Sequence, residues 1–209
     1  MVAEPVSAAE IVFVVDDDSS MRKALARLFR TVGLAAETFV SAEAFLLRAP
    51  CTGPCCAILD VRMPAVDGIA LQERLQAAGR DLPIIFITGQ GDVPSTVRGM
   101  KAGALDFIEK PFLSEDLLRA VRAALAESHS RLALSAQQGA LERRASTLTA
   151  REREVFALVA QGLPNKIVGA RLGTAEKTIK VHRGRVMKKM AASSLVELVR
   201  FAQRLGLGK

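Results

Sequence analysis

Short apolar runs alternate with helix-like patterns five times along the first half of this chain. The run over 11–15 is β-branched and is followed by three consecutive aspartates, and the run over 55–60 ends at Asp60. Runs this short, bounded by turn formers, are typical of strands buried on both faces of a parallel sheet. We predict strands over 11–15, 35–39, 55–60, 84–89 and 105–109, with helices over about 21–32, 41–48, 69–78 and 95–102. The alternation predicts an α/β fold with a five-stranded, doubly wound parallel sheet and right-handed crossovers.

The charged residues divide the chain into an acidic part and a basic part. Residues 1–127 hold 13 Lys+Arg and 17 Asp+Glu, net −4, whereas residues 128–209 hold 16 and 5, net +11. Such a division indicates that only the second part meets a polyanion. We predict a first domain over 8–127, a helical linker over 128–145 that breaks near Gly139, and a second domain over 146–209.

The composition also limits where the protein works. No apolar run approaches the roughly 18 residues of a membrane span, and the first residues show no basic and apolar secretion signal. The three cysteines, Cys51, Cys55 and Cys56, form an odd cluster without a nearby histidine, which argues against a disulfide framework or a zinc site. We therefore predict a cytoplasmic protein with reduced thiols and no membrane partner.

Polar side chains end four of the predicted strands. Asp16 and Asp17 follow the first strand, Asp60 the third, Thr88 the fourth and Lys110 the fifth. In the flavodoxin-like strand order these four strands are neighbours, and ligands bind at their carboxyl ends. Three carboxylates in one pocket need a compensating cation, and oxygen-only ligands suit Mg²⁺. The set predicts phosphoryl transfer, with Asp60 as the acceptor that forms an aspartyl phosphate.

The basic part contains helix signals only. Thr149 and Glu152 form a capping box, Asn165 is expected to cap a second helix, and a third helix covers about 175–190. A fourth helix begins at Ser193 or Ser194.

The third of these helices has two different faces. Its packed side is marked by Ile179, Val186 and Met190, and its outer charge comes from Lys177, Lys180, Arg183, Arg185, Lys188 and Lys189. Two helices joined by the tight turn at Gly173, the second of them basic, indicate a helix-turn-helix. The alternative is a basic helix that is merely solvated.

The first part resembles the receiver domain of two-component response regulators over residues 10–127, through VVDDD, LDVRMP, ITGQGDV and MKAGALDFIEKPF. The resemblance implies that a partner sensor histidine kinase phosphorylates Asp60. It also implies that Asp17, Asp60 and the backbone carbonyl of Arg62 hold Mg²⁺, with Asp16 acting through a water.

The same resemblance implies further roles around the acceptor. Thr88 and Lys110 would contact the phosphoryl group, and the Lys110–Pro111 bond would be cis. Phe107 takes the place of a switch aromatic that is often tyrosine, so a switch formed by Thr88 and Phe107 would work by packing alone.

The second part resembles the LuxR-type (NarL/FixJ) output domain over residues 146–207, through LTAREREVFALVAQGLPNK, KTIKVHRGRVMKKM and SSLVEL. The resemblance makes 175–190 the recognition helix. Lys180 and Val181 would meet base edges, and the remaining DNA contacts would come from Lys177, Arg183, Arg185 and Lys188. Gly184 departs from the family pattern, which usually has a DNA-facing side chain at that position.

Together these features predict a phosphorylation-controlled transcriptional regulator, and not an enzyme. Phosphorylation would favour a homodimer on double-stranded promoter DNA, with RNA polymerase as a further partner. Whether the unphosphorylated receiver masks the output domain or leaves it monomeric stays open. The alternatives are a phosphohydrolase, disfavoured because Arg62 replaces the general-acid aspartate of such enzymes, and a regulator whose receiver only dimerises.

Overall fold

The chain divides into two compact units between Leu132 and Ala133. The computed structural model describes residues 9–89 and 93–207. The predicted domain limits at residues 8 and 209 lie outside the described residues, and the remaining limits stay predictions. No helix within the described ranges is long and apolar enough to cross a membrane.

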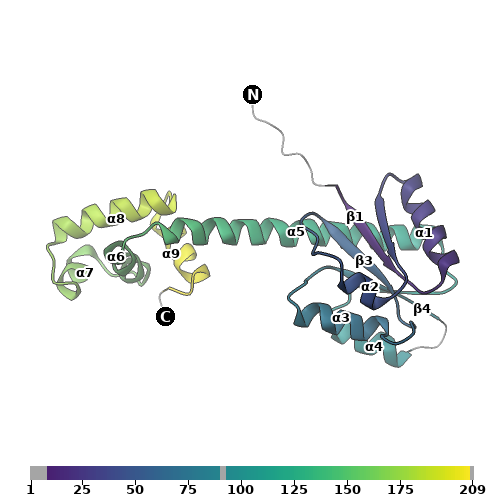
Figure 1. Ribbon diagram of the computed structural model, residues 1–209. Helices are drawn as coiled ribbons and strands as arrows, with labels where there is room; N and C mark the ends of the chain where they lie inside the picture. The colour runs from purple at the N-terminus through teal and green to yellow at the C-terminus, as the bar shows by residue number, and fades with distance from the viewer. Residues whose placement is uncertain (1–8, 90–92, 208–209) are drawn as a thin grey trace. The chain divides into compact units, whose positions relative to one another are not determined.

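The first unit is built on one parallel sheet (Figure 1). Among the described residues the strand order is β2-β1-β3-β4-β5, as predicted. The register pairs Val15 with Leu59 and Asp60 with Ile87, so β1, β3 and β4 end at the same edge. The strands are β1 Ile11–Val15, β2 Ala35–Phe39, β3 Cys55–Asp60, β4 Ile84–Thr88 and β5 Asp106–Glu109.

Alternate residues of the strands pack into two separate cores. Val12 and Val14 face a core with helices α1 (Ser19–Thr31) and α5 (Ser114–Ser146). Phe13 and Val15 face the opposite core with α2 (Ala42–Leu46) and α3 (Gly68–Ala77). Helix α4 (Val93–Lys101) lies beside α3. Both faces of the sheet are therefore covered, which explains why its strands are continuous apolar runs.

Helix α5 continues past the point where we expected it to break. It runs without interruption through Gly139 to Ser146, so the predicted break is wrong. A helix-interior glycine costs only about 1 kcal/mol, and the strong helix formers around it offset that cost. Burial of Leu141 in the core of the second unit stabilises this part of the helix further.

The second unit contains α6 (Ala150–Ala160), α7 (Asn165–Arg171), α8 (Glu176–Met190) and α9 (Leu195–Arg204). The capping box at the start of α6 is confirmed: the Glu152 amide donates to Thr149 Oγ1, and the Thr149 amide donates to Glu152 Oε2. The expected cap by Asn165 is wrong, because the cap residue is Pro164 and Asn165 begins the helix. The core of the unit includes Phe156 and Ile179.

Candidate phosphoacceptor site and basic recognition helix

Three carboxylates gather where β1 and β3 leave the sheet. Asp16 and Asp17 follow β1 directly, and Asp60 is the last residue of β3. Asp16 is only 2% exposed and Asp60 is also buried, whereas Asp17 faces solvent. One ligand oxygen from each lies within 4.8 Å of the others. These three residues form the acidic cluster, and its oxygens have the chemistry and spacing that suit Mg²⁺.

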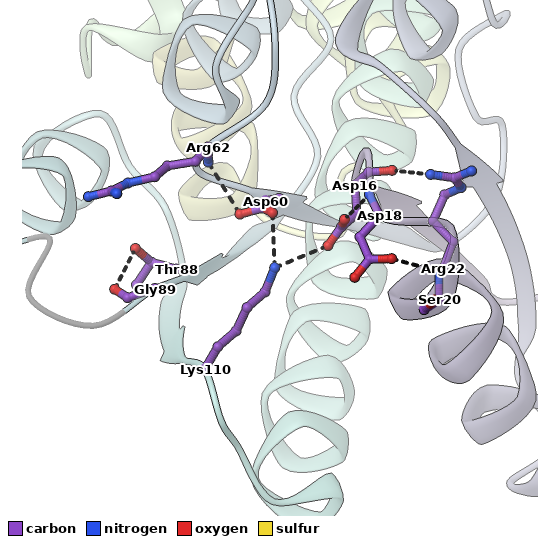
Figure 2. Close-up of polar contacts among 9 residues, drawn as sticks. All are labelled: Asp16, Asp18, Ser20, Arg22, Asp60, Arg62, Thr88, Gly89 and Lys110. Carbon is purple, nitrogen blue, oxygen red and sulfur yellow. Dashed lines mark hydrogen bonds and ion pairs between the residues drawn. The ribbon is translucent and has the colours of Figure 1, made fainter.

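Lys110 bridges the two buried carboxylates of the cluster (Figure 2). Its Nζ lies 2.9 Å from Asp60 Oδ2 and 3.3 Å from Asp16 Oδ2. The amide of Arg62 donates to the other oxygen of Asp60 at 3.2 Å. Lys110 and the acidic cluster thus come together as the sequence predicted, and Asp60 is held between a cation and a backbone donor.

Burial and charge shift the pKa values in this group. Burial raises the pKa of Asp16, and the negative charge of Asp60 adds to that effect, although the Asp18 amide and Lys110 oppose it. Burial acts to lower the pKa of Lys110, but hydrogen bonding and attraction to Asp60 and Asp16 outweigh it and raise that pKa. The lysine is therefore held charged, and the crowded carboxylates would gain from a second cation.

The backbone of the β1–α1 turn is fixed by two contacts. Arg22 Nη1 donates to the carbonyl oxygen of Asp16 at 2.7 Å, and the amide of Asp18 donates to Asp16 Oδ1 at 2.7 Å. Figure 2 shows Arg22 reaching back to this turn from α1. Sequence reasoning missed Arg22, since nothing local marks a contact between a helix side chain and a carbonyl six residues earlier.

The two predicted switch residues come from neighbouring strands: Thr88 is the last residue of β4, and Phe107 lies within β5. Thr88 is buried, and its hydroxyl donates to the carbonyl of Gly89 at 3.3 Å. The ring of Phe107 packs on that of Phe86 with centroids 4.8 Å apart. The expected cis bond between Lys110 and Pro111 is confirmed. Because Phe107 has no hydroxyl, its ring contacts Phe86 through apolar packing alone.

Two glycines that the sequence analysis did not single out allow close approaches here. A Cβ at Gly68 would lie 2.3 Å from the carbonyl oxygen of Asp60, and a Cβ at Gly99 would lie 2.4 Å from Cζ of Phe107. Neither position could carry a side chain unless its neighbours moved. A glycine inside a predicted helix, as at Gly99, was the available signal for a close contact.

Helix α8 presents one face to its own core and another to solvent. Ile179, Val186 and Met190 are buried, as predicted. The exposed side carries four lysines or arginines with a valine and a glycine among them. We call this set the reading face: Lys177, Lys180, Val181, Gly184, Arg185 and Lys188.

Two basic residues of α8 are held by the protein itself. Lys189 is half-buried and donates to Glu152 Oε2 at 2.6 Å and to the carbonyl of Thr147 at 2.9 Å, so its placement on the outer charged side is wrong. The partners lie 37 and 42 positions away in the sequence, and a helical wheel cannot show them. Arg183 is also half-buried and donates to Asn165 Oδ1 at 3.3 Å.

The comparisons with known proteins cover both units. Residues 12–122 match the family described as the response regulator receiver domain, and residues 146–202 match bacterial regulatory proteins of the luxR family. Nodulation protein W of Bradyrhizobium diazoefficiens is 47% identical over 96% of this chain and 88% of its own length. The transcriptional regulatory protein FixJ of the same species is 39% identical over 94% of this chain and 96% of its own. The structure of the response regulator StyR, 45% identical, covers 94% of this chain and all of its own, with a TM-score of 0.83.

Proposed function

This chain belongs to the two-component response regulators that join a receiver domain to a LuxR-type DNA-binding domain, and from that premise we propose how its own residues carry the signal. Membership makes it a transcription factor with a phosphorylatable aspartate, not an enzyme. A receiver implies a histidine kinase partner, and the helix-turn-helix implies binding to DNA. The residue roles below are our proposals.

Asp60 is the phosphoacceptor. The observation that carries this assignment is the convergence of Asp16, Asp17 and Lys110 on its carboxylate. One oxygen of Asp60 accepts from Lys110 and the other from the Arg62 amide, so the carboxylate is oriented before any phosphodonor arrives. Orientation and charge neutralisation supply most of the catalysis in phosphoryl transfer.

The acidic cluster fits Mg²⁺. Asp17 and Asp60 with the backbone carbonyl of Arg62 would hold the ion, and Asp16 would act through a water. When bound, the ion neutralises charge on the phosphoryl oxygens. Asp16 fits this role because its carboxylate is buried beside that of Asp60, where a second cation offsets their repulsion.

Lys110 and Thr88 contact the transferred group. Lys110 already lies within hydrogen-bond distance of Asp60, so its ammonium can follow the new phosphoryl oxygens with a small movement. Thr88 would exchange its bond to the Gly89 carbonyl for one to the phosphoryl group. The ring of Phe107 would then move from its contact with Phe86 into the space that Thr88 leaves, so the switch exchanges one apolar contact for another.

The reading face of α8 enters the major groove of duplex promoter DNA. Lys180 and Val181 meet base edges, and Lys177, Arg185 and Lys188 contact the backbone. Arg183, tied to Asn165, would contact a phosphate at the edge of the groove while keeping α8 in place against α7. Phosphorylation favours a homodimer that places two such helices on neighbouring half-sites, with RNA polymerase as a further partner. A DNA target places this work in the cytoplasm.

The test is incubation of the full chain with acetyl phosphate and Mg²⁺, followed by mass measurement and DNA retardation. We expect one added phosphoryl group, a shift to dimer and tighter retardation of DNA, all lost in Asp60→Asn. The matched control is Asp18→Asn, a neighbouring carboxylate whose role as the α1 cap asparagine fills equally well. Modification without any change in oligomeric state or DNA affinity would instead support a receiver that acts independently of phosphate.

A further inference from the structure

Two thiols line one cavity at the opposite edge of the sheet from the acidic cluster. Cys55 is the first residue of β3, whereas Asp60 is the last. Cys51 lies in the preceding loop, and both side chains line a cavity of ≈ 240 Å³ together with Arg80 and Asp81. Cys55 is buried and Cys51 is half-buried, so an aqueous reagent in the cavity meets Cys51 more readily.

The two cysteine side chains are neighbours. Both line the same cavity, and Cys51 packs against the core to which Cys55 belongs. Cys51 Sγ also donates to the carbonyl of Gly53 at 3.3 Å, within the same loop. Only residues 52–54 separate the two cysteines, and they form bends rather than helix or strand. A covalent bond between the thiols therefore requires adjustment of a short loop and not of the sheet.

Two arginines lie near Cys55. Arg48 and Arg80 favour its thiolate electrostatically, but they only partly oppose the effect of burial on its pKa. Their guanidinium groups lie over phenylalanine rings, that of Arg48 4.3 Å from the Phe13 centroid and that of Arg80 5.3 Å from the Phe45 centroid. Arg80 lines the cavity itself, whereas Arg48 packs on Phe13 and its Nε also pairs with Glu37 Oε2 at 2.8 Å. Positive charge near a thiol favours its thiolate form.

We propose that Cys51 and Cys55 form a peroxide-reactive dithiol site that closes to an intramolecular disulfide. The Cys51 sulfur attacks one oxygen of the peroxide, the O–O bond breaks, and the released hydroxide takes the thiol proton to give water. Cys55 then attacks the resulting sulfenic sulfur, the S–O bond breaks, and the second hydroxide leaves as water with the Cys55 proton. One peroxide is reduced to two waters while two thiols are oxidised to one disulfide.

The burial of the three cysteines assigns their order of reaction. Burial, and then the neighbouring Cys51, raise the pKa of Cys55 to about 12, so Cys55 stays protonated and reacts only after a sulfenic acid has formed beside it. Cys56 is fully buried, its pKa is also raised by burial, and its side chain packs into the opposite core with α1 and α5. Cys56 is therefore the internal control for a thiol that peroxide does not reach.

The experiment treats the full chain with hydrogen peroxide, alkylates the remaining thiols and measures mass without reduction. We expect two of the three thiols to become unavailable, with loss of two hydrogen atoms and recovery by dithiothreitol. Cys56→Ala should behave as the wild type. Cys51→Ser, at the half-buried position, should keep both remaining thiols free, and Cys55→Ala should stop at a Cys51 sulfenic acid that dimedone traps.

Several results would overturn this site. Three alkylatable thiols after peroxide treatment would do so, as would a disulfide that joins two chains. Loss of thiols that persists in Cys51→Ser would assign the reaction elsewhere. If Cys55→Ala does not fold, fragmentation of the wild-type peptide that contains all three cysteines still identifies which sulfurs are joined, and a bond to Cys56 contradicts the proposal.

Discussion

The acidic cluster and the reading face both concentrate charge, but they arrange it in opposite ways. In the first, Asp16 and Asp60 are buried and share one lysine. In the second, the lysines and Arg185 face solvent from one side of a helix. Buried charges depend strongly on their partners, whereas exposed charges act nearly independently and are screened by salt. We therefore expect large, coupled effects of substitution at the cluster and smaller, additive effects at α8.

The largest effect is expected from Lys110→Ala. The substitution leaves two buried carboxylates without their shared cation, which costs about 1–3 kcal/mol of unfolding free energy in the absence of Mg²⁺. Removing one charge-stabilising group should also slow phosphoryl incorporation by about 10²-fold or more. Urea unfolding in EDTA and in Mg²⁺, with acetyl phosphate labelling, measures both quantities.

Lys101→Ala, at an exposed lysine of α4, is the control for loss of a positive charge alone. It should leave both measurements near the wild-type values. If Lys110→Ala and Lys101→Ala gave equal results, the shared position of Lys110 between two carboxylates would have no special effect.

Gly99→Ala tests how tightly the rings of Phe107 and Phe86 are packed, for comparison with the acidic cluster. The new methyl group would lie 2.4 Å from the Phe107 ring and 3.0 Å from that of Phe86. Overpacking of this kind costs about 1–3 kcal/mol. Phe107→Leu should recover part of the loss in the double variant, and thermal unfolding of the four proteins completes the cycle. If the losses of stability in Gly99→Ala and Phe107→Leu simply add in the double variant, the new methyl group does not contact the Phe107 ring.

Substitutions on the reading face should give smaller, additive losses. Lys188→Ala should weaken binding to all duplex sequences to a similar degree and reduce the salt slope of log affinity by about 1. Lys180→Ala should in addition alter sequence preference, and the double variant should lose the sum of the two free energies. Fluorescence anisotropy over a salt series checks this, with Lys101→Ala again as the control. Strong coupling between the two lysines would contradict the expectation that exposed charges on the reading face act independently.

Glu152 and Lys189 form the exception within the second unit, because here a buried carboxylate depends on one lysine. The hydrogen bond from Lys189, and then the Thr149 amide, lower the pKa of Glu152 below its ordinary 4.5. A lowered pKa in the folded state means that stability is present above pH 4.5 and is lost as pH falls through the lower value. Glu152→Gln should cost about 1 kcal/mol at neutral pH and flatten this acid dependence. Acid titrations of the wild type and Glu152→Gln, followed by circular dichroism, measure this difference in acid dependence. Parallel unfolding curves for the two proteins would contradict the prediction.

The smallest effect, and one of opposite sign, is expected from Gly184→Ala. Nothing lies within 4 Å of a Cβ at this position, so the methyl group meets open space. Replacing a helix-interior glycine should stabilise the protein by up to about 1 kcal/mol. The melting temperature should rise slightly, in contrast to Gly99→Ala. A lower melting temperature would mean that the reading face is packed after all.

The sequence was informative wherever a contact follows from chain direction. Parallel strands that end in Asp16, Asp60 and Lys110 must meet at one edge, so the cluster could be predicted from their spacing alone. The same holds for Ile179 and Val186, whose helical periodicity assigns them to the core.

Contacts between distant segments could not be predicted in this way. Lys189 looked like another exposed charge, but its partner Glu152 comes from a different helix. Asn165 looked like a cap, but its side chain accepts from Arg183, eighteen positions later. The continuity of α5 was also missed, because a local break signal at Gly139 is weaker than the burial of Leu141.

The absence of a hydroxyl on Phe107 has a thermodynamic consequence. Moving this ring away from Phe86 exchanges hydrocarbon contact and hydration but neither breaks nor makes a hydrogen bond at the ring. Such a movement carries a heat-capacity change, and its driving force weakens on cooling. The balance between resting and signalling conformations should therefore drift with growth temperature, so that one level of phosphorylation yields different transcriptional output in the cold and in the warm.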